Sequence, residues 1–113
     1  MHVNTRMKKV NIKNTGARGW FVGAFDSAAI YSEEVELCYT DWDAVAVEPH
    51  YHTKCKESIL ILSGRCVLQG IEFGPGDMFI LEPGEINDAV FLEKSTVLGI
   101  KMPAGIDDKV YCK

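Results

Sequence analysis

The sequence contains no long apolar segment and no excess of basic residues. Its longest uninterrupted apolar stretches, such as Ile59 to Leu62, are far shorter than the roughly 18 residues that a membrane-spanning helix needs. The 12 Lys and Arg residues are outnumbered by 16 Asp and Glu residues, which gives a net charge of −4. The cation excess that drives binding to nucleic acids and anionic membranes is therefore missing. The segment Met1 to Asn14 also lacks the apolar run of a secretory signal, so we expect a cytoplasmic protein without nucleic-acid or membrane partners.

Paired cysteines are missing as well. The four cysteines are spread along the chain without a C-x-x-C pair, which excludes the spacing of a zinc ribbon or a thioredoxin-like redox site. In a reducing compartment we expect them to be free thiols. Cys55 lies between His52 and Glu57, but nothing in the sequence indicates a lowered thiol pKa, so a bystander role is favoured over a ligating or reactive one.

Helical periodicity is not found in any window of useful length. Short runs rich in Val, Ile, Phe and Tyr recur instead, with turns that contain Gly and Pro between them. This pattern predicts an all-β protein, and a length of 113 residues suits a single domain over residues 1–113. The predicted strands cover residues 20–25, 35–39, 44–51, 58–62, 65–68, 78–81, 89–92 and 96–101.

Two of the predicted strands, residues 58–62 and 78–81, are apolar at consecutive positions. A strand with one solvated face has alternating polarity, so this pattern indicates that both faces are covered. One face would meet the protein interior, and the other would meet a second copy of the chain or the N-terminal segment of the same chain. Of these two alternatives, we favour a homodimer.

Two histidines and a glutamate form the clearest candidate site. His50 and His52 lie two residues apart in a predicted strand, so both imidazoles point to one face and Tyr51 to the other. Glu57 follows after four residues, and a hairpin of that length can bring its carboxylate beside the two rings. Two imidazole nitrogens and one carboxylate oxygen suit a first-row divalent metal ion and leave positions for water or substrate. A His-x-His pair alone is nevertheless more often a surface or satisfied pair than a metal site.

A wider pattern favours the metal site. The run from His50 to Gly64 reads H-x-H, four residues, Glu57, six residues and Gly64, and it resembles the first motif of the cupin superfamily in residue types and spacing. The run from Gly76 to Asn87 resembles the second cupin motif, in which a turn containing Pro and Gly leads to another His. The resemblance implies a double-stranded β-helix, or jelly-roll barrel, with the site near one open end. Residues 44–102 would form the core of this barrel, and residues 1–18 an N-terminal arm or edge strand.

The resemblance also implies a set of metal ligands. His50, His52 and Glu57 take the positions of three ligands, and Asn87 stands where the family has its fourth ligand, a His. An amide oxygen is a harder and weaker donor than an imidazole, so the site should lose affinity and shift from zinc or copper towards manganese or iron. We predict that these four residues bind a divalent metal ion, which could be manganese, iron, nickel or zinc. The alternative is a metal-free pocket.

Glu34 and Glu36 form a second acidic pattern. They alternate along the predicted strand at residues 35–39, which is typical of a solvated face. If that face were interior, they would add acidic groups to the pocket.

Three functions fit the sequence. The favoured one is a small metal-binding cupin that acts on or binds an unidentified small molecule, with the question of turnover left open. The second is a metal-independent cupin similar to sugar-nucleotide isomerases and epimerases, with His50 or His52 as acid or base and with Arg65 and Lys101 as the main cations for a diphosphate. The third is a non-catalytic ligand-binding or sensor dimer.

Overall fold

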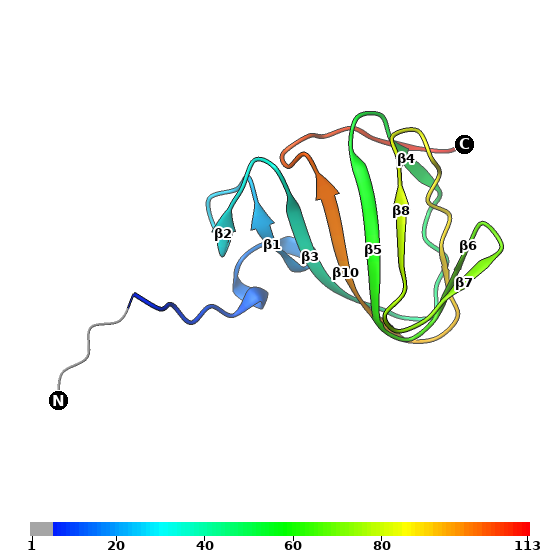
Figure 1. The fold of residues 1–113 in the computed structure, drawn as a ribbon, viewed down its shortest axis with the longest axis horizontal. Coiled ribbons are helices and arrows are strands. Elements are labelled where there is room, and N and C mark those ends of the chain that lie inside the picture. The colour runs from blue at the N-terminus through cyan, green and yellow to red at the C-terminus, as the bar shows by residue number, and fades with distance from the viewer. Residues whose placement is uncertain (1–5) are drawn as a thin grey trace.

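The structure, a computed structural model, describes residues 6–113 (Figure 1). Two three-residue 3-10 turns, η1 (Ile12–Asn14) and η2 (Ala17–Gly19), precede the strands. Within this part of the chain, no helix has the length and apolar character needed to cross a membrane. All the remaining regular elements of residues 6–113 are strands, which confirms the all-β prediction. They are β1 (Trp20–Gly23), β2 (Ile30–Tyr31), β3 (Glu36–Trp42), β4 (His50–His52), β5 (Lys56–Ser63), β6 (Cys66–Leu68), β7 (Ile71–Phe73), β8 (Met78–Leu81), β9 (Val90–Phe91), β10 (Ser95–Met102) and β11 (Lys109–Tyr111).

The strands form two layers. The larger layer is a six-stranded sheet in the order β2-β1-β3-β10-β5-β8, in which only the β1–β2 pair is parallel. The other layer consists of the sheets β7-β6-β9 and β11-β4. Isolated bridges between Ala46 and Val90 and between His50 and Asn87 connect segments of this second layer. Figure 1 shows β3, β10, β5 and β8 side by side, with β4 and the β6–β7 hairpin beyond β8.

The hydrophobic core lies between the two layers. Ile61, Phe79 and Val97 contribute to it from the six-stranded sheet, and Cys66 and Phe91 contribute from the facing sheet. Each of these side chains is at most 5% exposed. Burial alternates along β8 and for most of β10, because successive side chains of a strand point to opposite faces. This alternation identifies the inner face of the large sheet. Glu57 of β5 lies on that face.

The segment at residues 44–51 differs most from the sequence-based expectation. Only residues 50–52 form a strand there, and Ala46 makes a single bridge. Pro49 has no N–H to donate to a strand ladder, which accounts for the late start of β4. The short strands β2, β7 and β11 were not predicted. Residues 6–18 contain η1 and the start of η2 but no strand, so the described part of the N-terminal segment forms no edge strand.

The outer face of the large sheet explains the consecutive apolar residues of β5 and β8. Cross-strand pairing places Tyr39, Leu98, Leu60 and Met78 in one row on this face. Tyr39 and Met78 are each 41% exposed, and Ile80 in the neighbouring row is 56% exposed. Residues 6–11 run away from the barrel in Figure 1, so this described part of the N-terminal segment does not cover the row. Within residues 6–113 of one chain, nothing covers this outer apolar row fully.

Candidate metal centre

The two histidines of β4 lie inside the barrel, on the face predicted from the strand period. His50 is 5% exposed and His52 is 4% exposed, whereas Tyr51 between them is half-buried. The two rings meet edge to face with their centroids 5.6 Å apart. The backbone around them is held by the second motif, since the N–H of Gly84 donates to the His52 carbonyl at 2.7 Å. Gly84 has a φ of +90°, a turn conformation that favours glycine.

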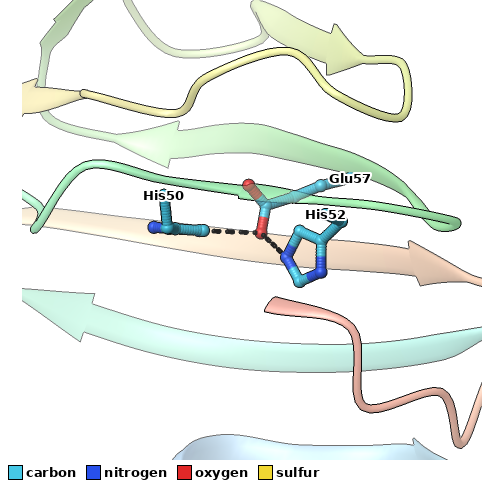
Figure 2. Close-up of side chains that lie close together, drawn as sticks. All are labelled: His50, His52 and Glu57. Carbon is cyan, nitrogen blue, oxygen red and sulfur yellow. Dashed lines mark hydrogen bonds and ion pairs between the residues drawn. The ribbon is translucent and has the colours of Figure 1, made fainter. Parts of the chain in front are cut away.

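Glu57 reaches both rings from the next strand. Its Oε2 atom lies 3.4 Å from Nε2 of His50 and 3.0 Å from Nε2 of His52 (Figure 2). One ligand atom from each of the three residues falls within 4.8 Å of the others. The convergence predicted from the spacing of these residues is therefore present. The predicted hairpin is not, because β4 pairs with β11 and β5 with β10 and β8; the short connection between β4 and β5 instead crosses from one sheet to the other and brings the carboxylate beside the imidazoles.

The other nitrogen of each ring is fixed by a hydrogen-bond acceptor. His50 Nδ1 lies 2.9 Å from the Glu48 carbonyl oxygen, and His52 Nδ1 lies 2.8 Å from Oδ1 of Asp108. A carbonyl and a carboxylate only accept hydrogen bonds, so Nδ1 of each ring must carry the proton. In the neutral rings, both Nε2 atoms then present a lone pair towards Glu57. Acceptors on Nδ1 that fix the tautomer in this way are typical of metal-binding histidines.

Asp108 is kept ionised by its surroundings. Its Oδ2 atom accepts the backbone N–H groups of Lys54 and Cys55, each at 2.8 Å. Burial alone would raise the pKa of Asp108, but the hydrogen bonds from His52 and from these N–H groups outweigh it and hold the pKa well below its ordinary value. Asp108 thus remains a charged acceptor for His52.

Glu57 is also held in its charged form. Burial opposes ionisation, but the hydrogen bond that Nε2 of His50 donates when its ring is protonated, together with the one from Asn87, outweighs it and lowers the pKa of Glu57 from 4.5 to about 2. The same contact with Glu57 raises the pKa of His50, against the effect of burial. Two lone pairs and a carboxylate oxygen would repel one another without a cation among them. A proton on a ring or a divalent metal ion can supply that positive charge, so the donor set fits a metal ion.

Asn87 contacts Glu57 from the side opposite the histidines. Its Nδ2 atom donates to Oε1 of Glu57 at 2.8 Å, and its Oδ1 atom accepts the N–H of Ala89 at 3.1 Å. These two bonds fix which end of the amide faces the carboxylate. In this arrangement Asn87 orients Glu57, and its amide oxygen is already used by the backbone. A ligand role for Asn87 stays a prediction, and it requires the amide to rotate and release Ala89.

Three contributors to the site were missed or only partly foreseen. Asp108 was not predicted, and Lys101 was considered only as a cation for a diphosphate. Lys101 Nζ lies 3.4 Å from Glu36, lies 3.8 Å from Asp108, and donates to the Ile106 carbonyl at 2.6 Å. Glu36 lies on the inner face and lines the cavity, so for this residue the less favoured of the two alternatives holds. Glu34 is exposed and precedes β3. The only feature of the sequence that could have pointed to Asp108 is the short strand β11 that follows it, which contains Val110 and Tyr111.

Cys55 does not present its thiol to the candidate ligands. The side chain is buried, and its Sγ atom lies 3.6 Å from the Pro103 carbonyl oxygen. Burial, together with the nearby Asp108 carboxylate, raises the pKa of Cys55 to about 11, so the thiol stays protonated at neutral pH. Its backbone N–H, not its sulfur, contributes to the site by binding Asp108.

The candidate ligands lie in the wall of an interior cavity of about 800 Å³. This volume is within the range of roughly 300–1,000 Å³ that is usual for small-molecule sites. Lys101, Glu36 and Tyr111 also line it, whereas Arg65 does not and instead pairs with Glu72 in an exposed ion pair. The candidate metal centre is therefore accessible to a small molecule in this cavity.

No protein-family model and no curated protein matches the sequence of this chain. Its structure is similar to solved structures of low sequence identity. A conserved protein with a double-stranded β-helix domain from Klebsiella pneumoniae is 16% identical, with 73% of this chain and 77% of that chain covered and a TM-score of 0.61. KdgF from a Halomonas species is 23% identical, with 64% and 71% covered and a TM-score of 0.59. A protein with a cupin-2 domain from Shewanella frigidimarina is 14% identical, with 59% and 69% covered and a TM-score of 0.52.

The chain has the cupin fold. The resemblance of its two motifs to those of the cupin superfamily is thereby supported by its three-dimensional structure. At these identities the similarity establishes the fold and not the reaction. The function of this protein must be argued from its own site.

Proposed function

We propose that this protein is a small metal-binding cupin, which holds a divalent metal ion through His50, His52 and Glu57 and binds or acts on a small molecule in the barrel interior. One observation carries the proposal: two Nε2 atoms whose tautomers are fixed by Glu48 and Asp108 point at one oxygen of an ionised carboxylate. When bound there, a divalent ion would act as a Lewis acid or bind oxygen. The protein side chains supply the ligand atoms, fix their protonation and shield them from bulk water.

Metal content tests this proposal directly. The protein, purified without a chelating tag, is incubated with manganese, iron, nickel or zinc, desalted and analysed for bound metal. We expect about one ion per chain in the native protein, and almost none in His50→Ala and Glu57→Ala. The exposed Glu93→Ala variant is the matched control and should bind as the native protein does. A native protein that retains none of the four metals would contradict the proposal.

An acid–base function without metal is the second candidate. It is favoured by one observation, the raised pKa of His50 beside Glu57, whose pKa is lowered to about 2, because such a pair can hold a proton at the site. The version with a sugar nucleotide as substrate is weakened, since Arg65 is paired with Glu72 outside the cavity and Lys101 already contacts two carboxylates. Metal analysis separates the two candidates. A screen of oxygen consumption over small acids and thiols then separates turnover from binding.

A homodimer formed through the outer face of the large sheet is part of the proposal. Two copies related by a twofold axis would place the same apolar rows against each other, and an apolar surface is complementary to itself. Ile80 and Met78, which are 56% and 41% exposed, would be covered in this way. Sedimentation velocity should show a dimer that Ile80→Lys dissociates. The control Ile86→Lys, 44% exposed and outside the sheet, should stay dimeric. A native protein that sediments as a monomer up to high concentration would exclude this dimer.

A further inference from the structure

The cavity beside the metal centre changes from polar to apolar along the inner face of the large sheet. Strand pairing places Glu36, Lys101 and Glu57 in one row across β3, β10 and β5. All three side chains line the cavity. Two residues further along each strand, about 7 Å away, the next inward row begins. A ligand that reaches the metal centre therefore extends over this second row.

The second row forms an apolar floor. It contains Cys38, Gly99, Ile59 and Phe79, which strand pairing places opposite one another. Gly99 has no side chain, and a Cβ atom there would lie only 2.6 Å from Cys38 Sγ, so the thiol covers the glycine closely. Burial raises the pKa of Cys38, so the sulfur is a neutral, polarisable surface. This floor carries no charge and lies directly beside Glu57.

Much of the opposite wall and the far end of the cavity is apolar too. Val47 and Ala89 line it from the facing layer, and Trp42 and Phe91 stack at the far end with their ring centroids 5.5 Å apart, while the polar Thr40 and Arg18 also line the cavity. Trp42, Val47 and Ile59 point inward yet are only partly buried, because they border the cavity. A wholly polar ligand would leave these surfaces without partners of matching polarity.

The charge of the metal centre indicates the other end of the ligand. Within the coordination sphere itself, two neutral imidazoles, one carboxylate and a divalent ion sum to a net charge of +1, which favours an anionic oxygen donor on the ion. Beyond this sphere, Asp108 and Glu36 carry negative charges and Lys101 carries a positive one. Three protein ligands leave room for additional oxygen donors on such an ion. The head group should therefore be anionic and carry two adjacent oxygen atoms.

We propose that the ligand of this cavity is an amphipathic small molecule, with an anionic, oxygen-chelating head at His50, His52 and Glu57 and a compact apolar body on the floor formed by Cys38, Ile59 and Phe79. This inference rests on the proposed metal-binding function. It goes beyond that function by assigning the polarity of both ends of the ligand and the residues that select the apolar end.

Two hydroxamic acids with the same head group test the inference. Acetohydroxamate has only a methyl group as its body, and benzohydroxamate has a phenyl ring. Both are titrated by calorimetry into the nickel-loaded protein. From the additional apolar area, we expect benzohydroxamate to bind about tenfold more tightly. In Ile59→Thr, which keeps a β-branched side chain, this preference should fall about threefold while acetohydroxamate binding stays unchanged.

Leu60→Thr is the matched control, since Leu60 is the next residue of β5, is also half-buried and points to the outer face. It should keep the native preference for benzohydroxamate. Unchanged acetohydroxamate binding shows that each variant is folded and has an intact metal centre. Equal affinities for both hydroxamates would overturn the inference while the metal site stands. A preference that Ile59→Thr and Leu60→Thr reduce equally would also overturn it. If the native protein retains no nickel, the proposed function fails, and the inference fails with it.

Discussion

The two carboxylate oxygens of Glu57 face neighbours of opposite chemistry. On one side, Oε2 meets the Nε2 atoms of His50 and His52 at 3.4 and 3.0 Å, where neutral rings present lone pairs. On the other side, Oε1 accepts a hydrogen bond of 2.8 Å from the Asn87 amide. The histidine side therefore needs a cation, whereas the asparagine side is already satisfied by the protein. In this structure, Asn87, which stands where the cupin motif has a His, orients Glu57 and leaves its own oxygen to the backbone.

Removing the charge of Asp108 should disturb the histidine side most. In Asp108→Asn, His52 loses the carboxylate that fixes its tautomer, and we expect nickel affinity to fall 10- to 100-fold. The free energy of unfolding should also drop by about 1–3 kcal/mol, because the N–H groups of Lys54 and Cys55 lose a charged acceptor. Competition with a chromogenic chelator and urea denaturation measure the two effects.

Asp107→Asn provides the control for this change. Asp107 is the neighbouring residue and is exposed, so both affinity and stability should stay at native values. If the two variants lose affinity to the same extent, the hydrogen bond from His52 to Asp108 does not set the affinity of the site.

The pH dependence of stability distinguishes the proton from the metal ion at the site. The pKa of Glu57 is lowered from 4.5, so its contribution to the metal-free protein is present above pH 4.5 and is lost as the pH falls towards 2. The pKa of His50 is raised from 6.5, so its contribution is present below pH 6.5 and is lost as the pH rises through the raised value. The contribution of the pair, on the order of 2 kcal/mol, should therefore be greatest between pH 4.5 and 6.5.

Nickel should reverse the pH dependence of the free energy of unfolding above pH 6.5. Metal binding requires deprotonated rings, and a ligand of the native state raises the free energy of unfolding, so stability with nickel should increase above pH 6.5. Urea denaturation at several pH values, with nickel and with a chelator, measures both curves. Glu57→Gln should flatten both of them, and native curves that are parallel would contradict a metal ion at this site.

Replacing Asn87 with His should have the smallest effect on metal affinity, and the affinity should rise instead of falling. Asn87→His restores the residue type that the cupin motif has at this position, and an imidazole is a better donor than an amide for nickel and zinc. We expect about a tenfold gain in affinity for these two metals and little gain for manganese. Asn87→Ala, which only removes the hydrogen bond to Glu57, is the matched variant and should lose affinity. A loss of affinity in both variants would show that the asparagine itself is needed by the site.

Much of the fold could be predicted from the sequence because the relevant patterns are local. Strand periodicity placed most strands of the large sheet, and the His-x-His spacing fixed the common face of His50 and His52. The short spacing between His52 and Glu57 kept the three-residue cluster together, although β4 and β5 lie in different sheets and form no hairpin. Each of these features depends on residues within eight positions of one another.

The remaining features depend on contacts between distant segments. Asp108 is 56 residues from His52 and reaches it only because β11 pairs with β4. Ala89 follows Asn87 by only two residues. Whether its N–H donates to the Asn87 amide oxygen nevertheless depends on the local backbone conformation, which a sequence motif does not specify. The extent of the strand before His50 was also overestimated, because apolar residues at 44–47 outweighed the effect of Pro49.

Anomalous diffraction from crystals soaked in nickel would test the central claim most directly. The account predicts one strong peak within coordination distance of Nε2 of His50, Nε2 of His52 and Oε2 of Glu57, with Nδ1 of His52 still bonded to Asp108. No anomalous peak at these three atoms, or one bound only by surface residues, would contradict it.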